Sequence, residues 1–237
     1  MQRYFVNEKL GNSFFIDNDD SYHITKVMRM QLKDKIEIVF QDKLFLCEII
    51  ELSPNVKCNI IKEFNDKSLF LPKVSIAQSL VKEQKMDYIL QKSTELGVYE
   101  IIPIYTERSI IKVKDKYDQK IERWKKVVKE ASEQSKRFTL PYLNRIINLN
   151  ELIKEKYDFK FVCSVNEKTK TIKNVLSNVN INDTILFVIG PEGGFSEKEE
   201  KLLVDNGFQP ITLGENVLRT ETSSTFVLSV INYHFMR

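Results

Sequence analysis

The first 70 residues alternate apolar and polar positions with a period of two, which is typical of strands that bury one face. The predicted strands lie at residues 3–6, 14–16, 36–40, 44–50 and 56–60. The third and fourth flank Gln41-Asp42-Lys43 and are predicted to form a hairpin. Ahead of the third strand, Asp20 or Ser21 is placed to cap a short helix that runs to Val27. The pattern predicts a small β-barrel over residues 1–70.

From residue 73 onward, apolar runs alternate with stretches of helical periodicity. The predicted strands lie at 74–77, 100–105, 159–163, 185–189 and 210–213, and the predicted helices at 83–96, 117–137, 196–206 and from Thr220 or Thr222 onward. This alternation predicts an α/β domain over residues 73–237. The strand at 185–189 is wholly apolar, which predicts burial on both faces, and Ser196 with Glu199 predicts a capping box at the start of the helix at 196–206. In the last helix His234 shares a face with Val227 and Ile231, which predicts a histidine packed in the core.

Composition narrows the class of protein. No apolar run reaches the roughly 18 residues of a membrane-spanning helix, and the N-terminus lacks the apolar core of a signal peptide, so a cytoplasmic location is expected. Cys47, Cys58 and Cys163 are far apart, which favours buried apolar thiols over disulfides or a metal site. The net charge is only +3, but residues 105–137 hold a basic run that is either a solvated helix face or a nucleic-acid surface.

Glycine is concentrated in one part of the chain. Of seven glycines, five lie between residues 190 and 214. Glycine is used where the backbone needs a positive φ or where another group must approach closely. We therefore expect residues 185–226 to build a ligand-binding site.

A nucleotide is not the expected ligand of this site. Gly190-Pro-Glu-Gly-Gly194 follows a buried strand and precedes a helix, as phosphate loops do, but it lacks both the G-K-[ST] ending and the G-x-G-x-x-G spacing. Glu192 lies in the loop, and Glu197, Glu199 and Glu200 lie in the first turn of the helix. These carboxylates already complement the helix dipole and would repel phosphate, so a neutral or cationic ligand is favoured.

S-adenosyl-L-methionine meets this requirement, because it carries a sulfonium cation and no phosphate. Three loops that follow successive strands could hold it, at 164–166, 190–194 and 213–219. The chain has no H-E-x-x-H motif, no Ser-His-Asp ordering and no cluster of Cys and His ligands. We therefore expect no metal, and a cofactor that brings the reactivity.

Motifs from one end of the chain to the other carry a family resemblance. The glycine-rich loop with Phe195-Ser196, then Leu213-Gly214 and Val217-Leu-Arg-Thr-Glu-Thr222, look like the signature of the SPOUT methyltransferases. The nearest subgroup is small subunit methyltransferase E, which methylates N3 of uridine 1498 in 16S ribosomal RNA. Further matching stretches are Arg3-Tyr-Phe, His23-Ile-x-x-Val-x-Arg29, Lys92-Ser-Thr-Glu-Leu-Gly97, Glu107-Arg-Ser109 and Glu130-Ala-Ser-Glu-Gln-Ser-x-Arg137.

The resemblance implies a fold, a cofactor and partners. It implies that residues 73–237 form a SPOUT methyltransferase domain with a C-terminal α/β trefoil knot, an exception to the rule against threaded chains. It implies that residues 1–70 form a PUA-like β-barrel that binds RNA. The expected protein is an S-adenosyl-L-methionine-dependent homodimer that acts on 16S ribosomal RNA of the small subunit, with no membrane partner. Two alternatives stay open, a SPOUT enzyme with another target such as a ribose 2′-O position, and a non-catalytic RNA-binding protein.

The candidate site residues follow from the same motifs. Arg219 could stabilise a developing uracil anion, or instead pair with Glu221, and these two are the candidate catalytic residues; no general base is identified. The cofactor-binding candidates are Ser164, Val165, Ile189, Gly190, Pro191, Glu192, Gly193, Gly194, Leu213, Gly214, Val217, Leu218, Arg219 and Thr220. The RNA-binding candidates, each with a plain surface or salt-bridge role as the alternative, are Arg3, His23, Arg29, Lys82, Arg108 and Arg137. Asn216 stands where the family often has arginine, and Ser223 where alanine is usual, so a contact by that arginine is not carried over.

Overall fold

The computed structural model describes residues 1–64, 71–109 and 117–236. Residues 65–70, at the end of the predicted barrel, and residues 110–116 of the basic run lie outside the described residues. The chain divides into two compact units, Met1–Ser68 with Ser132–Leu140, and Leu69–Ala131 with Pro141–Arg237. The sequence did not predict that Ser132–Leu140 groups with the N-terminal unit.

The N-terminal unit is built on a six-stranded sheet with the order β1-β4-β5-β6-β3-β2. Its strands are β1 Arg3–Phe5, β2 Glu8–Leu10, β3 Ser13–Phe15, β4 Lys35–Phe40, β5 Lys43–Glu51 and β6 Lys57–Phe64. The predicted hairpin is confirmed, since β4 and β5 pair antiparallel around Gln41 and Asp42, which both have positive φ. Strand β2 was not predicted, because its three residues are all exposed and show no alternation.

The short helix of this unit begins earlier than the sequence predicted. Helix α1 (Asn18–Tyr22) continues into a π-helical turn, η1 (His23–Val27). Its N-cap is Asp17, whose carboxylate accepts from the backbone N of Asp20, so the choice of Asp20 or Ser21 was wrong. Ser21 is buried instead, where its hydroxyl donates to the carbonyl O of Ile16 and accepts from the backbone N of Val56.

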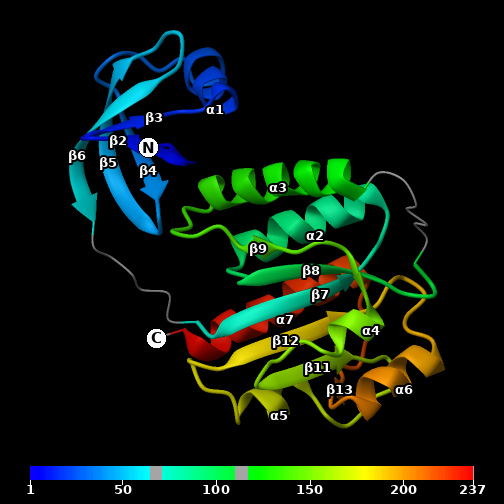
Figure 1. Ribbon diagram of the computed structural model, residues 1–237. Coiled ribbons are helices and arrows are strands. Elements are labelled where there is room, and N and C mark those ends of the chain that lie inside the picture. Colours follow the sequence, from blue (N-terminus) through cyan, green and yellow to red (C-terminus); the bar gives the residue numbers. More distant parts are fainter. Residues whose placement is uncertain (65–70, 110–116, 237) are drawn as a thin grey trace. The chain divides into compact units, whose positions relative to one another are not determined.

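The second unit contains a seven-stranded sheet in which every pair is parallel, as the alternation of strands and helices predicted. The order is β10-β8-β7-β12-β11-β13, with β9 also paired to β8 (Figure 1). The strands are β7 Lys73–Ser79, β8 Glu100–Tyr105, β9 Tyr142–Leu143, β10 Ile147–Asn148, β11 Phe159–Cys163, β12 Thr184–Ile189 and β13 Gln209–Ile211. The helices are α2 Glu83–Glu95, α3 Tyr117–Gln134, α4 Leu149–Leu152, α5 Ile172–Leu176, α6 Glu197–Asp205 and α7 Thr220–Phe235.

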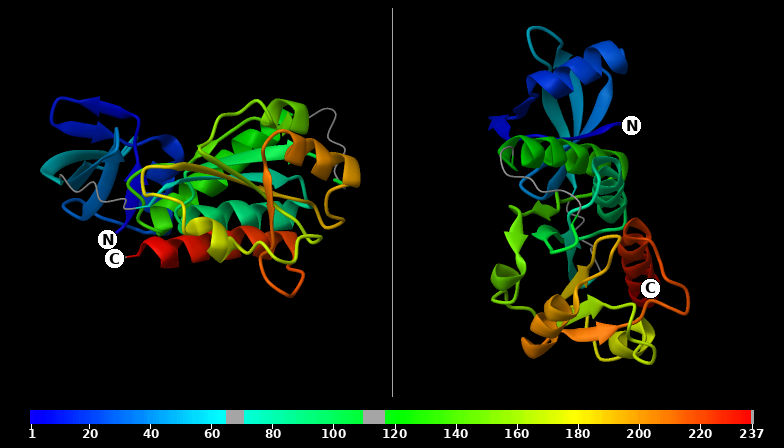
Figure 2. Two further views of the ribbon diagram at one scale, coloured as in Figure 1. Left: turned by 90° about the horizontal axis from the view of Figure 1, so that it is seen from below. Right: turned by 90° about the vertical axis from the view of Figure 1, so that its right-hand side faces the viewer.

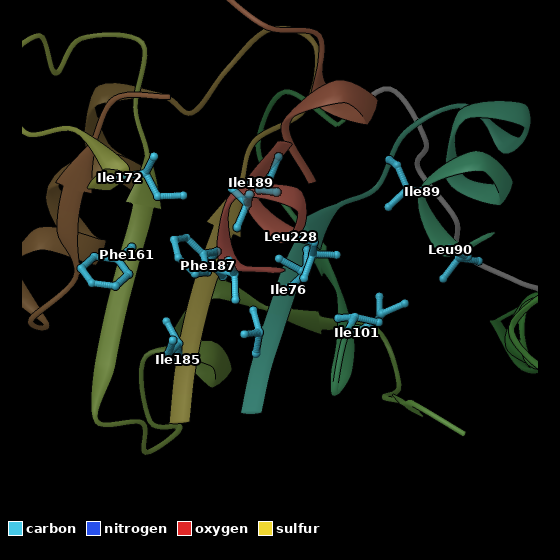
Figure 3. Packing of buried hydrophobic residues seen from close by; sticks show 14 of the residues in the cluster. Ile76, Ile89, Leu90, Ile101, Phe161, Ile172, Ile185, Phe187, Ile189 and Leu228 are labelled. Carbon is cyan, nitrogen blue, oxygen red and sulfur yellow. The ribbon is translucent and has the colours of Figure 1, made fainter. Parts of the chain in front are cut away.

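Strand β12 is buried on both faces, as its wholly apolar sequence predicted. Ile185 and Phe187 join the core on one side of the sheet, which α2, α3, α5 and α7 cover (Figure 3). Leu186 and Val188 join the core on the other side, which α4 and α6 cover. Figure 2 shows the helices on both sides of this sheet. The carboxyl ends of β11, β12 and β13 therefore meet at one edge, with helices behind them.

Helix α7 differs from its prediction at both ends. Its N-cap is Arg219, so neither Thr220 nor Thr222 caps it. His234 is exposed rather than packed, because the buried residues of α7 end at Ile231 and its last turn is largely solvated. The trefoil knot stays a prediction. Within the described part of the chain, no helix has the length and apolarity to cross a bilayer.

Candidate functional site

A cavity of about 350 Å³ lies at the carboxyl ends of β11 and β12, next to the first turn of α7. All three predicted loops contribute to it. Eleven of the fourteen cofactor-binding candidates line it, namely Ser164, Val165, Ile189, Gly190, Pro191, Glu192, Gly194, Val217, Leu218, Arg219 and Thr220. Leu213 and Gly214 line a smaller hollow of about 50 Å³ that shares several walls with it, and Gly193 lines neither.

The loop after β12 is held in a tight turn against the cavity. The backbone N of Gly194 donates to the carbonyl O of Pro191 at 2.9 Å, and Gly194 has φ +68°. A Cβ on Gly190 would lie 3.2 Å from the ring of Phe195, which is closer than side chains normally approach. A side chain at position 190 would therefore need Phe195 to shift by a few tenths of an ångström. Phe195 lines the cavity, and the sequence did not single it out.

The loop that follows β8 supports this turn from outside. Nη1 of Arg108 donates to the carbonyl O of Gly193 at 2.7 Å and to that of Phe195 at 3.2 Å. The buried carboxylate of Glu199 forms the predicted capping box with Ser196 and also accepts from the backbone N of Glu107 at 2.7 Å. Arg108, an RNA-binding candidate, is thus engaged with the backbone of the glycine-rich loop.

Thr220 joins the start of α7 to the end of β12. Its hydroxyl donates to the carbonyl O of Gly190 at 2.7 Å and accepts from Nε2 of Gln78, on β7, at 2.9 Å. Thr220 and Gln78 are both buried, so these bonds are shielded from water. The sequence selected Thr220 for the site but assigned it the role of a cap.

Lys85 connects three segments around the cavity. Its ammonium lies 3.0 Å from Oε1 of Glu192 in the loop after β12 and 3.5 Å from Oε2 of Glu221 in α7. The hydrogen bond to Glu192 raises the pKa of Lys85. Burial alone would raise the pKa of Glu192, but its backbone hydrogen bond and Lys85 outweigh that effect and lower the pKa. The sequence missed Lys85, because nothing in the pattern of α2 distinguishes it from a solvated lysine.

Arg219 lines the cavity and is exposed. Among the described residues, the ion pair of Glu221 is with Lys85 and not with Arg219. The alternative role for Arg219, a structural pair with Glu221, is therefore not what the structure shows. Its guanidinium stays available to a ligand at the rim of the cavity.

The cavity lining contains a second carboxylate besides Glu192, that of Glu200, which was not among the candidate residues predicted from the sequence. It accepts from the hydroxyl of Ser164, and its Oε2 accepts from Nδ2 of Asn166 at 3.1 Å. Cys163 also lines the cavity, and burial raises the pKa of its thiol to about 12, so the thiol is neutral. Cys47 and Cys58 are buried in the N-terminal unit, as predicted, but Cys163 is half-buried because it borders the cavity.

Two RNA-binding candidates of the N-terminal unit have structural partners. Arg3 is only 6% exposed; Nε donates to Glu37 at 2.9 Å, and Nη1 donates to the carbonyl O atoms of Lys136 and Arg137. Its guanidinium also lies 4.9 Å from the ring centre of Phe138. Arg137 is half-buried, and burial lowers its pKa to about 10. Arg3 therefore lacks the exposure that an RNA contact needs.

The remaining RNA-binding candidates are more accessible. His23 is half-buried, with Nδ1 3.1 Å from the hydroxyl of Tyr4, while Arg29 is exposed in a left-handed conformation. Tyr22 beside them is 64% exposed. In the second unit Lys82 is exposed at the start of α2, and its charge contributes to the lowered pKa of Glu192, which places it near the cavity.

Comparisons with known proteins find the same family of RNA methyltransferases along nearly the whole chain. Residues 69–232 match the family model described as an RNA methyltransferase domain, and residues 16–61 match an RNA methyltransferase PUA domain. The chain is 35% identical to ribosomal RNA small subunit methyltransferase E of Bacillus subtilis, over 98% of this chain and 96% of the relative. It is 33% identical to the protein of the same name from Mesomycoplasma hyopneumoniae, over 97% and 98% of the two chains.

Solved structures show the same similarity. A ribosomal RNA small subunit methyltransferase E from Neisseria gonorrhoeae, bound to S-adenosyl methionine, is 28% identical, with 99% of this chain and 98% of that chain covered and a TM-score of 0.87. A methyltransferase from Legionella pneumophila, in complex with the bound cofactor SAM, is also 28% identical, with 98% and 97% covered and a TM-score of 0.91. Both similarities span the two units.

Proposed function

This chain belongs to the ribosomal RNA small subunit methyltransferase E family, and from that membership we propose that it uses S-adenosyl-L-methionine to methylate N3 of uridine 1498 in 16S ribosomal RNA. The observation that carries the proposal is the cavity of about 350 Å³ formed by the loops after β11, β12 and β13. Its volume lies in the range of small-molecule sites, roughly 300–1,000 Å³.

The residues of the cavity fit this cofactor. Apolar walls from Ile189, Pro191 and Leu218 suit an adenine ring, and the backbone groups of the glycine-rich loop offer hydrogen bonds beside them. Glu192 and Glu200 put carboxylates in the lining, which suits a cation and opposes a nucleoside phosphate. When bound, S-adenosyl-L-methionine supplies an electrophilic methyl group.

Arg219 is the residue proposed to act on the base. N3 of uracil must lose a proton before it can attack the methyl group, and the resulting negative charge spreads over the uracil ring. An exposed guanidinium at the rim of the cavity can stabilise that charge. The carboxylate of Glu221 lies 3.5 Å from the ammonium of Lys85. We therefore propose that Glu221 positions Lys85 next to Glu192 and does not contact the base.

Two separate sets of RNA contacts are proposed, His23 and Arg29 in the N-terminal unit and Lys82 in the second unit. A paired uridine hides N3, so the base must be single-stranded or flipped out. Arg3 is left out because it is only 6% exposed and is engaged with Glu37 and two backbone carbonyl groups. Arg137 is half-buried, as His23 is, and stays a weaker candidate. The homodimer and the cytoplasmic location remain predictions.

The test is to map the methyl group. Small ribosomal subunits, or free 16S RNA, from cells that lack this activity are incubated with the protein and S-adenosyl-L-methionine, and nuclease fragments are analysed by mass spectrometry. The expected product is N3-methyluridine at position 1498, and a 2′-O-methyl ribose would overturn the proposed position. Cofactor binding by calorimetry without any methylated RNA would instead indicate a binding protein. Arg219→Ala should lose at least about 100-fold in the rate of methyl transfer at saturating cofactor, as removal of an oxyanion-type donor does.

A further inference from the structure

The charged side chains that line the cavity, among the described residues, are Lys85, Glu192, Glu200 and Arg219. They are not equivalent. The charge of Glu192 is offset by Lys85 at 3.0 Å. Arg219 is exposed, so water screens its charge. Glu200 is the carboxylate whose charge remains to be accounted for.

Glu200 is held by neutral groups. It accepts from the hydroxyl of Ser164 and from the amide of Asn166, and the backbone N of Asn166 donates to the same Ser164 hydroxyl at 3.1 Å. Within the described part of the chain Glu200 forms no ion pair, and the ammonium of nearby Lys168 donates to the carbonyl O of Val165. Neutral donors fix the carboxylate in place but leave its full negative charge.

The other carboxylates of this region are used differently. Glu199 is buried in the capping box and accepts from the backbone N of Glu107. Glu197 is exposed and does not line the cavity. The sequence assigned these acidic residues jointly to a cationic ligand, but the structure gives them different roles. Among the described residues, Glu200 is the half-buried carboxylate that lines the cavity and has no cationic partner.

We propose that Glu200 makes the cavity discriminate between S-adenosyl-L-methionine and its product, S-adenosyl-L-homocysteine. The two differ by one methyl group and by the positive charge on sulfur, and they share the adenosine and the amino acid portion. A half-buried carboxylate with no counter-ion stabilises the sulfonium form selectively, which favours release of the product after methyl transfer. The inference rests on the proposed function.

The experiment compares both ligands on matched variants by isothermal titration calorimetry. Glu200→Gln keeps the shape and an acceptor for Ser164 but removes the charge. We expect its affinity for S-adenosyl-L-methionine to fall about tenfold and that for S-adenosyl-L-homocysteine to change less than about twofold, because only the first ligand carries the sulfonium charge. Glu200→Asp keeps the charge and should keep most of the discrimination.

Glu197→Gln is the control, because it makes the same change in net charge on the same helix at a solvated position; both affinities should stay within about twofold of the original. Glu200→Ala removes the charge by a different route and supplies a second measurement if Glu200→Gln does not fold. Equal losses for the two ligands would overturn the inference, since Glu200 would then contact a part that they share. If the unaltered protein binds neither ligand, the proposed function itself fails.

Discussion

The ammonium of Lys85 lies 3.0 Å from Oε1 of Glu192, although one belongs to helix α2 and the other to the loop after β12, more than 100 residues later. Glu221 at 3.5 Å adds the first turn of α7 to the same contact. A single lysine thus connects the glycine-rich loop to the two helices beside it. Its side chain is only 30% exposed, so the contact is partly shielded from salt and water.

Replacing Lys85 by methionine should weaken cofactor binding about three- to tenfold, because the glycine-rich loop loses the ion pairs that connect it to α2 and α7 and becomes less ordered. The protein should also be less stable at pH 7. The lowered pKa of Glu192 means that this contribution is present above the unfolded pKa of about 4.5 and is lost as the pH falls through the folded pKa. Urea unfolding at pH 7 and pH 4, followed by the fluorescence of Trp124, measures it.

Lys92→Met is the matched control for this prediction. Lys92 lies on the same helix, but its partner Glu95 is a neighbour on that helix rather than part of the cavity. Its replacement should leave cofactor affinity unchanged. A stability difference between the original protein and Lys85→Met that does not narrow toward acid pH would contradict the role given to Glu192.

Thr220→Val should destabilise the second unit by about 2 kcal/mol, because the substitution keeps the shape but leaves the Gly190 carbonyl and the Gln78 amide without their partner in a buried place. Thr220→Ser keeps the hydroxyl and should lose less than about 1 kcal/mol. Chemical denaturation of the three proteins tests this. A loss for serine as large as that for valine would contradict the prediction, since the methyl group would then contribute as much as the hydroxyl.

Arg108→Ala should lower cofactor affinity about fivefold in the absence of RNA, because the carbonyl groups of Gly193 and Phe195 lose their donor and the loop becomes less ordered. Arg108→Lys, with one point charge in place of a fork, should recover part of the loss. Calorimetry without RNA measures the affinity for the cofactor separately from the affinity for RNA. If only RNA affinity falls, Arg108 is an RNA contact, as its sequence motif suggested.

Gly190→Ala should destabilise the second unit by about 1–3 kcal/mol, because the new methyl group would meet the ring of Phe195 at 3.2 Å and its backbone N at 3.4 Å. Gly193→Ala is the control for stability. Its methyl group would meet only the flexible side chain of Arg108, at 3.4 Å, so a loss below about 1 kcal/mol is expected. Thermal unfolding of both variants compares them, and equal losses would show that the ring of Phe195 shifts to accommodate the new methyl group.

Much of the fold was readable in the sequence because it depends on local periodicity. The hairpin of β4 and β5, the doubly buried β12 and the capping box at Ser196 each lie within one short, continuous stretch of chain, and all three are confirmed. The misplaced features depend on distant partners. Ser21 looks like a cap but is buried against Val56, and Thr220 looks like a cap but donates to Gly190.

By itself, the sequence determined the two classes of sheet and the three loops that surround the cavity, because parallel strands carry their carboxyl ends to one edge whatever packs around them. Only the tertiary structure decided which charges remain free there. A carboxylate in a sequence has no partner until the chain folds. Lys85 offsets Glu192 across more than 100 residues, and Ser164 and Asn166 hold Glu200 without neutralising it, so electrostatics between distant segments had to be read from the fold.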